Sequence, residues 1–377
     1  MSELKIYLYY TGGTIGMGSS ESESPAKLEA FIKQLKLYPQ LHTKSDDKGW
    51  IYLPSGSARG FPEPQRALKY MIDGTKDPIE SCNMKPQDWQ DLARTIYDCY
   101  DDYDGFVILH GTDTMAFTSS ALSFLLQGLK KPVIVTGSKI PLFHSRSDAV
   151  DHILGSLLIA GYLSHVASIQ QVCVFFNSKL FQGNRVVQQS CEDMDAFGSP
   201  SNLPLLELNV QVKVNSDTKK ANEGDLQIFT LNRTPDIGIL QLFPGIDERY
   251  VARSLEGAEA VILLTYGLGN VPDDDWFFKL LRKAVTSGAL IVCSTQCYRG
   301  AVCKVAQVSP EVRQVHRAYE KLVAAGVIPG HDLTMEAAIA KLVWVLNQSE
   351  DSGRRREQAS AVEVVDSAHT GGQTDKT

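Results

Sequence analysis

The sequence predicts an α/β protein with a larger N-terminal parallel-sheet domain and a smaller C-terminal α/β domain. Three observations lead to this prediction. Apolar runs of strand length alternate with segments of helical periodicity, which is typical of strands that pair in parallel. The alternation occurs twice along the chain, on either side of the polar stretch 215–224. With 377 residues, of which 43% are hydrophobic, the chain can bury the cores of two domains.

The first elements are predicted from apolar runs and their spacing. Residues 6–10 form an apolar run that we expect to be a strand. Further along, apolar residues recur at helical spacing, and they are Trp89, Leu92, Ala93, Ile96 and Tyr100. The helical pattern breaks at the acidic segment 101–104, and the apolar run 106–109 follows it as a second expected strand.

Another helix and a third strand are expected directly afterwards. The helix is marked by Leu122, Leu125, Leu126 and Leu129. Pro132 stops the helical pattern, and residues 133–135 form a short apolar run with the character of a buried strand. Strand, helix and strand in this order predict a parallel sheet in the N-terminal domain.

The C-terminal half repeats the pattern after a connecting segment. Residues 208–214 alternate between apolar and polar side chains, which indicates a hairpin-like linker. Strands are expected at 260–264 and 290–293, and a helix between them starts with Asp273 to Asp275 in its first turn. The last segment is polar and has too few large apolar residues to fold independently. We therefore place an N-terminal domain at 1–207, a linker at 208–232, a C-terminal domain at 233–348 and a disordered tail at 349–377.

Composition restricts the partners and the cellular location. The formal net charge of −7 argues against nucleic acid or an anionic membrane as the main partner, because both require a basic surface. No apolar run reaches membrane-spanning length, and the N-terminus lacks the pattern of a signal peptide. Seven cysteines without a C-x-x-C pair suit reduced thiols. We expect a cytoplasmic protein whose partner is a small molecule.

Two threonines stand on glycine-rich turns that follow expected strands. Residues 10–17 read Tyr-Thr-Gly-Gly-Thr-Ile-Gly-Met, and residues 110–114 read His-Gly-Thr-Asp-Thr. Ligands of open parallel sheets bind outside the carboxyl ends of the strands, so Thr14 and Thr112 are candidates for one shared site. Taken singly, each motif is equally compatible with a turn that closes a strand and caps the next helix.

Taken together, the two motifs resemble those of the asparaginase/glutaminase family, and within it the cytosolic type I L-asparaginases. The resemblance extends from about Ile6 to Asn347. Further matching segments are 103–105 (Tyr-Asp-Gly), 135–138 (Val-Thr-Gly-Ser), 183–185 (Gly-Asn-Arg), 243–245 (Phe-Pro-Gly), 266–270 (Tyr-Gly-Leu-Gly-Asn) and 295–297 (Thr-Gln-Cys).

The resemblance implies a function and a set of site residues. It implies that Thr14 attacks the side-chain amide of L-asparagine, that ammonia leaves, and that water hydrolyses the resulting aspartyl ester. Asp113 would bind the substrate's α-ammonium, Ser81 with the neighbouring Glu80 would bind near the α-carboxylate, and Thr112 would position the reacting carbonyl or the water. The family needs no metal or cofactor and assembles as homodimers or homotetramers.

The chain departs from the family pattern at several positions. Glu80 stands where aspartate is more usual, and three further departures concern groups that could assist the reaction. Ser24 stands where a mobile-loop tyrosine is usual, and Gln188 stands where the Gly-Asn-Arg motif normally leads to a lysine that contacts the second threonine. Without that cation, general-base help worth about 10² to 10⁴-fold is lost unless another group replaces it. Lys139 occupies a position that is uncharged in related sequences. It is a candidate for a relocated cation in the substrate site, or else a solvent-facing lysine.

Several functions therefore remain open from the sequence. The first is L-asparagine hydrolysis, and the second is an asparagine-binding or regulatory protein with weakened catalysis on the same fold. An asparaginase-like subunit of a tRNA-dependent amidotransferase and a lysophospholipid hydrolase are less favoured, because the chain shows neither the extra N-terminal domain nor the repeats of those relatives. Glutamine is only one methylene longer than asparagine, so a side activity on L-glutamine also remains open.

Overall fold

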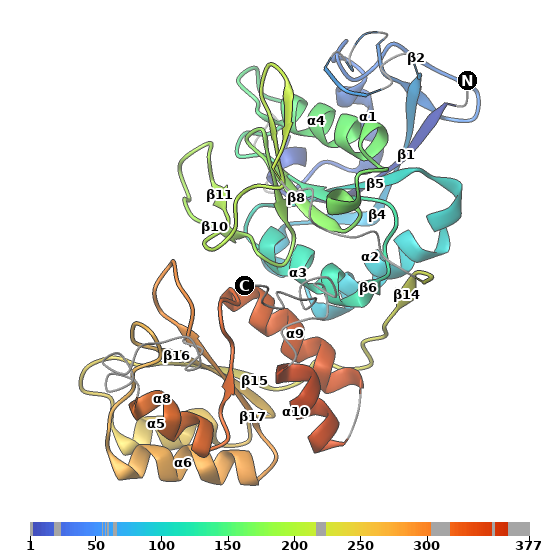
Figure 1. The fold of residues 1–377 in the computed structure, drawn as a ribbon. Helices are drawn as coiled ribbons and strands as arrows, with labels where there is room; N and C mark the ends of the chain where they lie inside the picture. The colour runs from blue at the N-terminus through green and yellow to red at the C-terminus, as the bar shows by residue number, and fades with distance from the viewer. Residues whose placement is uncertain are drawn as a thin grey trace, which may run out of the picture. The chain divides into compact units, whose positions relative to one another are not determined.

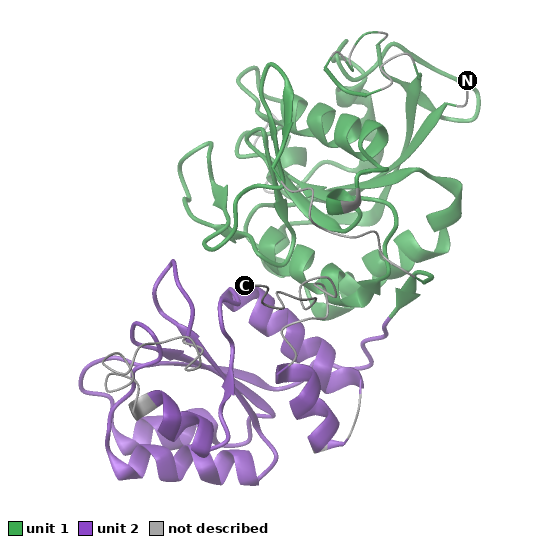
Figure 2. Ribbon diagram, viewed as in Figure 1, with its two compact units in different colours: residues 1–228 green, residues 229–377 purple. Residues whose placement is uncertain are grey.

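The computed structural model of the chain describes residues 3–18, 24–54, 56, 58, 60–62, 66–215, 224–302, 317–348 and 351–360. The chain divides into two compact units, Met1–Ile228 and Phe229–Thr377 (Figure 2). The division falls within the segment 208–232. Each unit is built on its own sheet with a parallel core, so the predicted α/β fold class, with a larger N-terminal and a smaller C-terminal sheet, is confirmed.

In the described part of the first unit, ten strands form one sheet in the order β13-β12-β9-β8-β7-β5-β1-β4-β3-β2. The central strands β8, β7, β5, β1 and β4 are parallel, whereas both edges are antiparallel to their neighbours. The strands are β1 Leu4–Gly12, β2 Lys44–Ser45, β3 Ile51–Tyr52, β4 Leu68–Ile79, β5 Gly105–Leu109, β7 Val133–Thr136, β8 Val172–Phe176, β9 Lys179–Gln182, β12 Leu206–Leu208 and β13 Val212–Val214.

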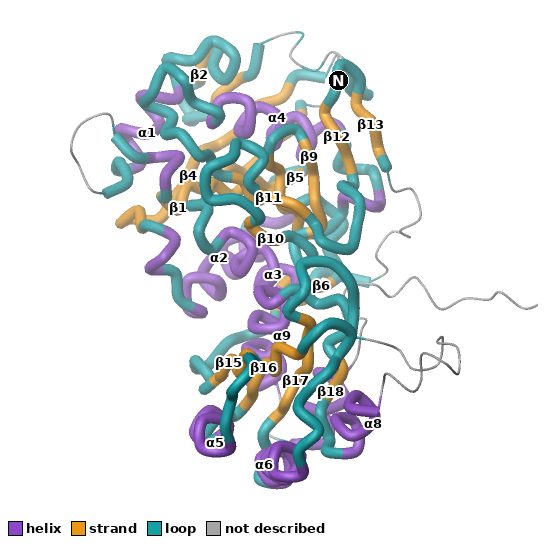
Figure 3. The backbone as a smooth tube through the Cα atoms, turned by 90° about the vertical axis from the view of Figure 1, so that its left-hand side faces the viewer, coloured by secondary structure: helices purple, strands orange, loops and turns teal. Residues whose placement is uncertain are grey.

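Helices cover both faces of this sheet (Figures 1 and 3). They are α1 Leu28–Leu35, α2 Pro86–Asp98, α3 Met115–Leu125 and α4 Ala149–Tyr162. The start of α2 is fixed by the Asp88 carboxylate, which accepts a hydrogen bond from the Lys85 backbone N–H at 2.6 Å. The helix expected from Leu122 onward ends at Leu125, because Leu126 and Gln127 form the short strand β6 (Leu126–Gln127), which pairs with β14 (Gln227–Ile228).

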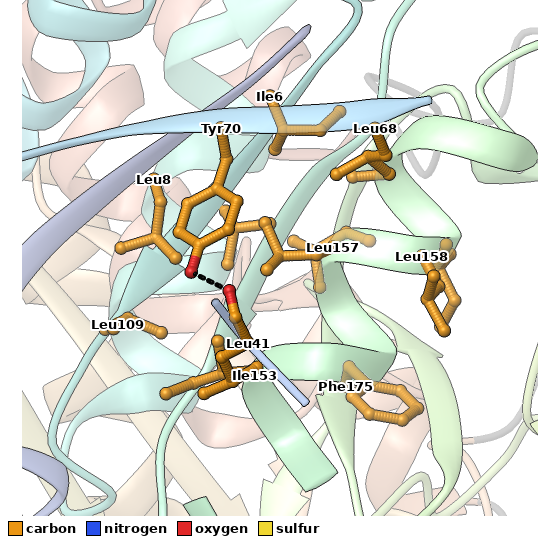
Figure 4. Packing of buried hydrophobic residues seen from close by; sticks show 14 of the residues in the cluster. Ile6, Leu8, Leu41, Leu68, Tyr70, Leu109, Ile153, Leu157, Leu158 and Phe175 are labelled. Atoms are coloured by element: carbon orange, nitrogen blue, oxygen red, sulfur yellow. Dashed lines mark hydrogen bonds between the residues drawn. The ribbon is translucent and has the colours of Figure 1, made fainter. Parts of the chain in front are cut away.

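Alternation along the central strands divides their side chains between two layers. Ile6 and Leu8 of β1 and Leu109 of β5 point toward α4, where they pack with Ile153 and Leu157 (Figure 4). All five side chains are fully buried. This packing fixes the register of β1 against β5, since a slip of one residue would turn the apolar set toward the opposite layer. The carboxyl ends of the two strands are thereby held level.

The segment 208–214 is not a linker, and that part of the prediction is wrong. Its alternating side chains form a hairpin, as the pattern indicates, but the hairpin consists of β12 and β13 and extends the large sheet from β9. Leu206 is fully buried in the main core of the first unit. The alternation reflects one covered face of an edge hairpin rather than a free connection.

The second unit contains a parallel sheet in the order β15-β16-β17-β18. Its strands are β15 Ile237–Gln241, β16 Ala260–Thr265, β17 Leu290–Thr295 and β18 Ile328–Pro329. Its described helices are α5 Glu248–Leu255, α6 Asp275–Thr286, α8 Arg317–Ala324, α9 Met335–Gln348 and α10 Ser352–Ser360. Helices α5, α6 and α8 lie on one face of the sheet, and α9 and α10 lie on the other (Figure 1). The strands expected at 260–264 and 290–293 are present.

The expected disorder from Ser349 onward is wrong for residues 352–360, which form α10. Asp351 caps this helix, because its carboxylate accepts a hydrogen bond from the Arg354 backbone N–H at 2.7 Å. The ammonium of Lys341, on α9, is buried and donates to the Ala359 carbonyl at 2.9 Å. Arg356 donates to the Gly326 carbonyl. A polar segment is therefore ordered by hydrogen bonds to the rest of its unit. Residues 361–377 lie outside the described part.

Removal of residues 351–377 is expected to destabilise the second unit. The truncation takes the Ala359 carbonyl away from the buried Lys341 ammonium, and hydrogen bonds to charged groups are worth about 1.5 to 3 kcal/mol. A truncation that removes only 361–377 keeps α10 and serves as the control. Chemical denaturation followed by circular dichroism measures both. Equal unfolding midpoints for the two truncations would show that α10 contributes nothing.

No helix in the described part of the chain is long and apolar enough to cross a membrane.

Candidate active site

The candidate site lies where neighbouring parallel strands of the first unit end. Tyr10 of β1 pairs with Leu109 of β5, and Leu109 pairs with Thr136 of β7. The turns that follow these strands carry Thr14, Thr112 and Ser138. Strand β4, on the other side of β1, ends at Ile79 and leads into Glu80 and Ser81. All four turns are therefore at the carboxyl edge of one sheet, where ligands of such folds bind.

Two glycines bring the two threonine turns into direct backbone contact. Gly13 adopts a φ of 79°, and a methyl group on it would lie 2.2 Å from the Gly111 Cα. A methyl group on Gly111 would in turn lie 2.6 Å from the Ser81 hydroxyl oxygen. The Gly13 N–H donates to the Ile79 carbonyl at 2.9 Å. Only glycine permits this approach, so the segments that carry Thr14, Ser81 and Thr112 meet at one place.

Thr14 begins a short 3-10 turn, Thr14–Gly16, and is half-buried. Within the described residues its hydroxyl has no hydrogen-bond partner. The turn is anchored on both sides. The Ala26 N–H donates to the Gly16 carbonyl at 2.8 Å, and the Leu142 N–H donates to the Ile15 carbonyl at 3.0 Å. The Tyr10 hydroxyl donates to the Ala26 carbonyl at 2.9 Å and holds Ala26 in place. A fixed backbone with an unengaged hydroxyl suits a nucleophile.

The second turn presents one buried and one exposed polar residue. Thr112 is 5% exposed, whereas the Asp113 carboxylate is open to solvent. The Thr114 hydroxyl donates to the Ser81 carbonyl at 2.8 Å, which fastens the loop after β4 to this turn. Ser81 is 3% exposed and Glu80 is half-buried. The sequence-predicted residues Thr14, Glu80, Ser81, Thr112 and Asp113 thus lie on adjoining segments.

His110, which carried no role in the sequence analysis, lies directly beneath the second turn. It is fully buried, its Nδ1 is 2.7 Å from the Gly111 carbonyl oxygen, and its Nε2 has no partner among the described residues. Burial lowers the pKa of His110 to about 4, although the Gly111 contact and the charge of Asp113 oppose the shift. The imidazole is therefore neutral near pH 7. The only signal in the sequence is a polar residue placed between a buried strand and a glycine.

The third turn, after β7, carries Lys139. A methyl group on Gly137 would lie 2.4 Å from the His110 carbonyl oxygen, so this turn adjoins the second one. The Ser138 hydroxyl donates to the Ile140 carbonyl at 2.8 Å. The N–H groups of Lys139 and Ile140 each donate to the Asp148 carboxylate at 2.9 Å. Lys139 is half-exposed, and in the described part of the chain its ammonium has no recorded partner.

Gln188 belongs to a small hairpin made by β10 (Val187–Gln188) and β11 (Phe197–Gly198). Its amide nitrogen donates to the Ser190 carbonyl at 3.3 Å, and no hydrogen bond joins it to Thr112 among the described residues. Ser24 is exposed and lies at the edge of the described residues, because 19–23 are outside them. Over those same described ranges, no group of three His, Cys, Asp or Glu side chains is arranged to hold a metal ion.

Comparisons with known proteins agree with the motifs. Residues 5–220 match the family model described as "Asparaginase, N-terminal", and residues 236–358 match the "Glutaminase/Asparaginase C-terminal domain". L-asparaginase 1 of Escherichia coli (strain K12) is 37% identical over 362 residues, which cover 96% of this chain and 97% of that protein. The 60 kDa lysophospholipase of Mus musculus is 35% identical over 355 residues, 92% of this chain but only 59% of that relative's length.

A solved structure agrees in fold over nearly the whole chain. The crystal structure of L-asparaginase I from Vibrio cholerae superposes with a TM-score of 0.79 at 36% sequence identity, and the match covers 96% of this chain and 98% of that one. The second family match ends at residue 358, inside α10, so the helix at 352–360 lies largely within the matched region.

Proposed function

The chain belongs to the asparaginase family, and from this premise we propose that it hydrolyses L-asparagine to L-aspartate and ammonia. The observation that carries the proposal is the contact between Gly13 and Gly111, which brings the turns of Thr14, Thr112 and Ser81 together. Relatives that match this chain over almost their full length are named L-asparaginases.

In the proposed reaction the Thr14 hydroxyl is the nucleophile. Its oxygen forms a bond to the side-chain carbonyl carbon of asparagine, the carbon–nitrogen bond breaks, and the hydroxyl proton leaves with the amide nitrogen as ammonia. The product is an aspartyl ester on Thr14. Water then attacks the same carbon, releases L-aspartate and restores the hydroxyl. This two-step route replaces one difficult hydrolysis by two easier acyl transfers.

The neighbouring side chains would hold the substrate's charged end. Asp113 is exposed at the turn and carries the negative charge that an α-ammonium needs, and a charge-assisted hydrogen bond is stronger than a neutral one. Ser81, with Glu80 beside it, would contact the α-carboxylate from the loop that Thr114 fastens in place. Thr112 would position the reacting carbonyl or the attacking water.

The mechanism also needs a group that assists transfer of the proton from the Thr14 hydroxyl. Gln188 cannot take up a proton, and its amide is engaged by Ser190. Lys139 stands on the third turn with an ammonium that has no recorded partner in the described part of the chain. We propose that Lys139 supplies the cation of the site.

The substitution Lys139→Met is expected to lower turnover of L-asparagine by about 10² to 10⁴-fold, the worth of general acid–base help, and to leave the fold intact. Lys130→Met is the matched control, because Lys130 is exposed at the opposite end of β7. Initial rates of ammonia release and thermal unfolding measure the two variants. If Lys139→Met turns over at the wild-type rate, Lys139 is a solvent-facing lysine.

The function itself is tested by ammonia release from purified protein. L-asparagine and L-glutamine are supplied separately, and ammonia is compared with the aspartate or glutamate formed. We expect one aspartate for each ammonia from asparagine. A pocket distinguishes substrates that differ by a methylene by only about 1 to 3 kcal/mol, so a slower release from glutamine is compatible with the proposal.

The hydrogen bond from the Gln188 amide to the Ser190 carbonyl favours a second candidate function. In this alternative, the chain is an asparagine-binding or regulatory protein with weakened catalysis. Titration calorimetry with L-asparagine separates it from the enzyme. Binding heat without ammonia release would overturn the proposed hydrolysis and support the binding protein. We further propose a homodimer or homotetramer in the cytoplasm, to be tested by light scattering during size-exclusion chromatography and by cell fractionation.

A further inference from the structure

The position of the third turn determines the space available to the second turn. A methyl group on Gly137 would lie 2.4 Å from the His110 carbonyl oxygen and 3.7 Å from the Thr112 methyl carbon. The backbones of the two turns are therefore in van der Waals contact. Interiors packed at this density transmit displacements, so a shift of Gly137 also shifts the backbone that carries Thr112.

A buried histidine holds Gly137 in place. His152, on α4, is 4% exposed, and its Nδ1 is 2.8 Å from the Gly137 carbonyl oxygen. Its Nε2 is 3.0 Å from the backbone nitrogen of Asn177. A backbone N–H can only donate, so Nε2 accepts and carries no proton. The proton is on Nδ1, which donates to Gly137. Both ring nitrogens are thus satisfied only in the neutral imidazole.

The surroundings of His152 favour this neutral form. On its own helix, Asp148 has a carboxylate oxygen 3.6 Å from Nδ1, and Asp151 is exposed. The Asp148 carboxylate already accepts two backbone N–H groups from the third turn. From β8, the rings of Phe175 and Phe176 pack against the imidazole. Burial lowers the pKa of His152, and Gly137, Asp148 and Asp151 oppose the shift only in part.

The other side of His152 leads to the segment that carries Gln188. Asn177 is at the tip of the β8–β9 hairpin, where it adopts a φ of 46°. In the same hairpin, the Lys179 ammonium donates to the Asp195 carboxylate at 2.7 Å. The Gln189 side-chain amide donates to the Asp195 carbonyl at 3.1 Å. Gln189 directly follows Gln188, so the hairpin tip is connected through Asp195 to the β10–β11 loop.

We propose that His152 is a positioning residue that joins the third turn to the β8–β9 hairpin and so fixes the placement of Thr112 and of the loop carrying Gln188. The inference rests on the proposed hydrolysis of asparagine. A proton on Nε2 would face the Asn177 N–H and break this connection. The connection is therefore present above the lowered pKa of His152 and is lost as the pH falls through it, in a range below the ordinary histidine value of about 6.5.

Two substitutions separate positioning from mere packing. His152→Leu keeps the apolar volume but removes both hydrogen bonds. His152→Gln keeps one donor and one acceptor and does not titrate. We expect His152→Leu to lower kcat by about 10 to 10²-fold, the usual cost of a small misplacement of reacting groups, with little change in KM. We expect His152→Gln to restore kcat at neutral pH and to move the acidic decline of kcat to lower pH.

Hydrogen–deuterium exchange gives a readout that does not depend on turnover. Faster exchange is expected in His152→Leu for peptides spanning 133–142 and 172–198, and wild-type exchange is expected in His152→Gln. Asp195 is half-exposed, so its replacement should leave the core intact. We expect Asp195→Ala to speed exchange in the peptide 172–198, because the substitution removes the carboxylate that binds Lys179. The exchange experiment tests the role of His152 even if the wild-type protein releases no ammonia. Absence of ammonia release would overturn the proposed function but not the proposed connection through His152.

The inference is overturned if His152→Leu keeps the wild-type kcat, pH profile and exchange. It is also overturned if His152→Leu and His152→Gln are equally impaired and unfold at equally lowered temperature, because that pattern marks a purely structural residue. If neither histidine variant yields folded protein, wild-type exchange in Asp195→Ala overturns the connection to the β10–β11 loop, and faster exchange supports it.

Discussion

Replacement of Thr14 by alanine is expected to abolish ammonia release from L-asparagine while the fold is retained. The substitution removes the oxygen that would form the ester, and loss of a nucleophile typically costs about 10⁴-fold or more in kcat. The fold should tolerate it because the Thr14 hydroxyl has no partner among the described residues, so no buried group is left unpaired. Steady-state ammonia release and thermal unfolding measure the two effects.

Matched variants at the same position define the origin of the loss. Thr14→Val has the shape of threonine without the hydroxyl and should be as inactive as alanine. Thr14→Ser keeps the hydroxyl without the methyl group and should retain measurable turnover. If Thr14→Ala still releases ammonia while Thr112→Ala does not, the nucleophile is Thr112 and the proposed roles of the two threonines are exchanged.

Asp113→Asn is expected to weaken the use of L-asparagine by about 10 to 10²-fold in kcat/KM, because the substitution replaces a charge-assisted hydrogen bond to the α-ammonium by a neutral one. Most of the change should be in KM, since the contact exists before and during the reaction. Asp101→Asn is the control, because Asp101 is an exposed acid that precedes β5 at the opposite edge of the sheet.

A substrate without the α-amine gives this prediction a sharper test. Succinic acid monoamide carries the same side-chain amide and carboxylate as asparagine but has no ammonium group. Wild-type protein should use it poorly, and Asp113→Asn should lower that rate no further. An equal loss on both substrates would mean that Asp113 acts on the turn or on the reacting group rather than on the ammonium.

The central strands were predictable because their signal is local. Strands β1, β5, β7, β16 and β17 are short apolar runs with glycine or polar turns beside them, and each is fixed by the burial of its own residues. Strand β4 carried no comparable signal, because its second half, from Asp73 onward, is polar and exposed in part. It is formed by pairing with β1, which is a contact distant in sequence.

Helix α10 and the position of β12 and β13 were missed for a related reason. The helix is polar on most of its surface and is held by Lys341 and Gly326, two residues of its unit outside the segment itself. From its composition alone, such a polar segment is predicted to be disordered. The edge hairpin was recognised as a hairpin, but nothing within 206–214 indicates which sheet it joins.

The candidate site could be predicted where its residues stand inside motifs. Thr14 and Thr112 follow from two glycine-rich turns, and the proposed roles of Asp113, Ser81 and Glu80 follow from the resemblance. The contact between Gly13 and Gly111 depends on the pairing of β1 with β5, so the motifs suggest it without determining it. His152 could not be found, since its partners are the backbone groups of Gly137 and Asn177, which leave no side-chain pattern.

The contact between Gly13 and Gly111 also limits how this chain can vary. A substitution that overpacks a protein core can be offset by a smaller side chain on the facing residue, because cores tolerate simultaneous changes that keep the total volume. Here both facing residues are already glycine, so neither has a smaller replacement. In a library that randomises Gly13, Gly111 or both, every variant other than the parent should lose the backbone contact between the two turns. A screen for second-site suppressors of a substitution at one glycine should recover no suppressor at the other.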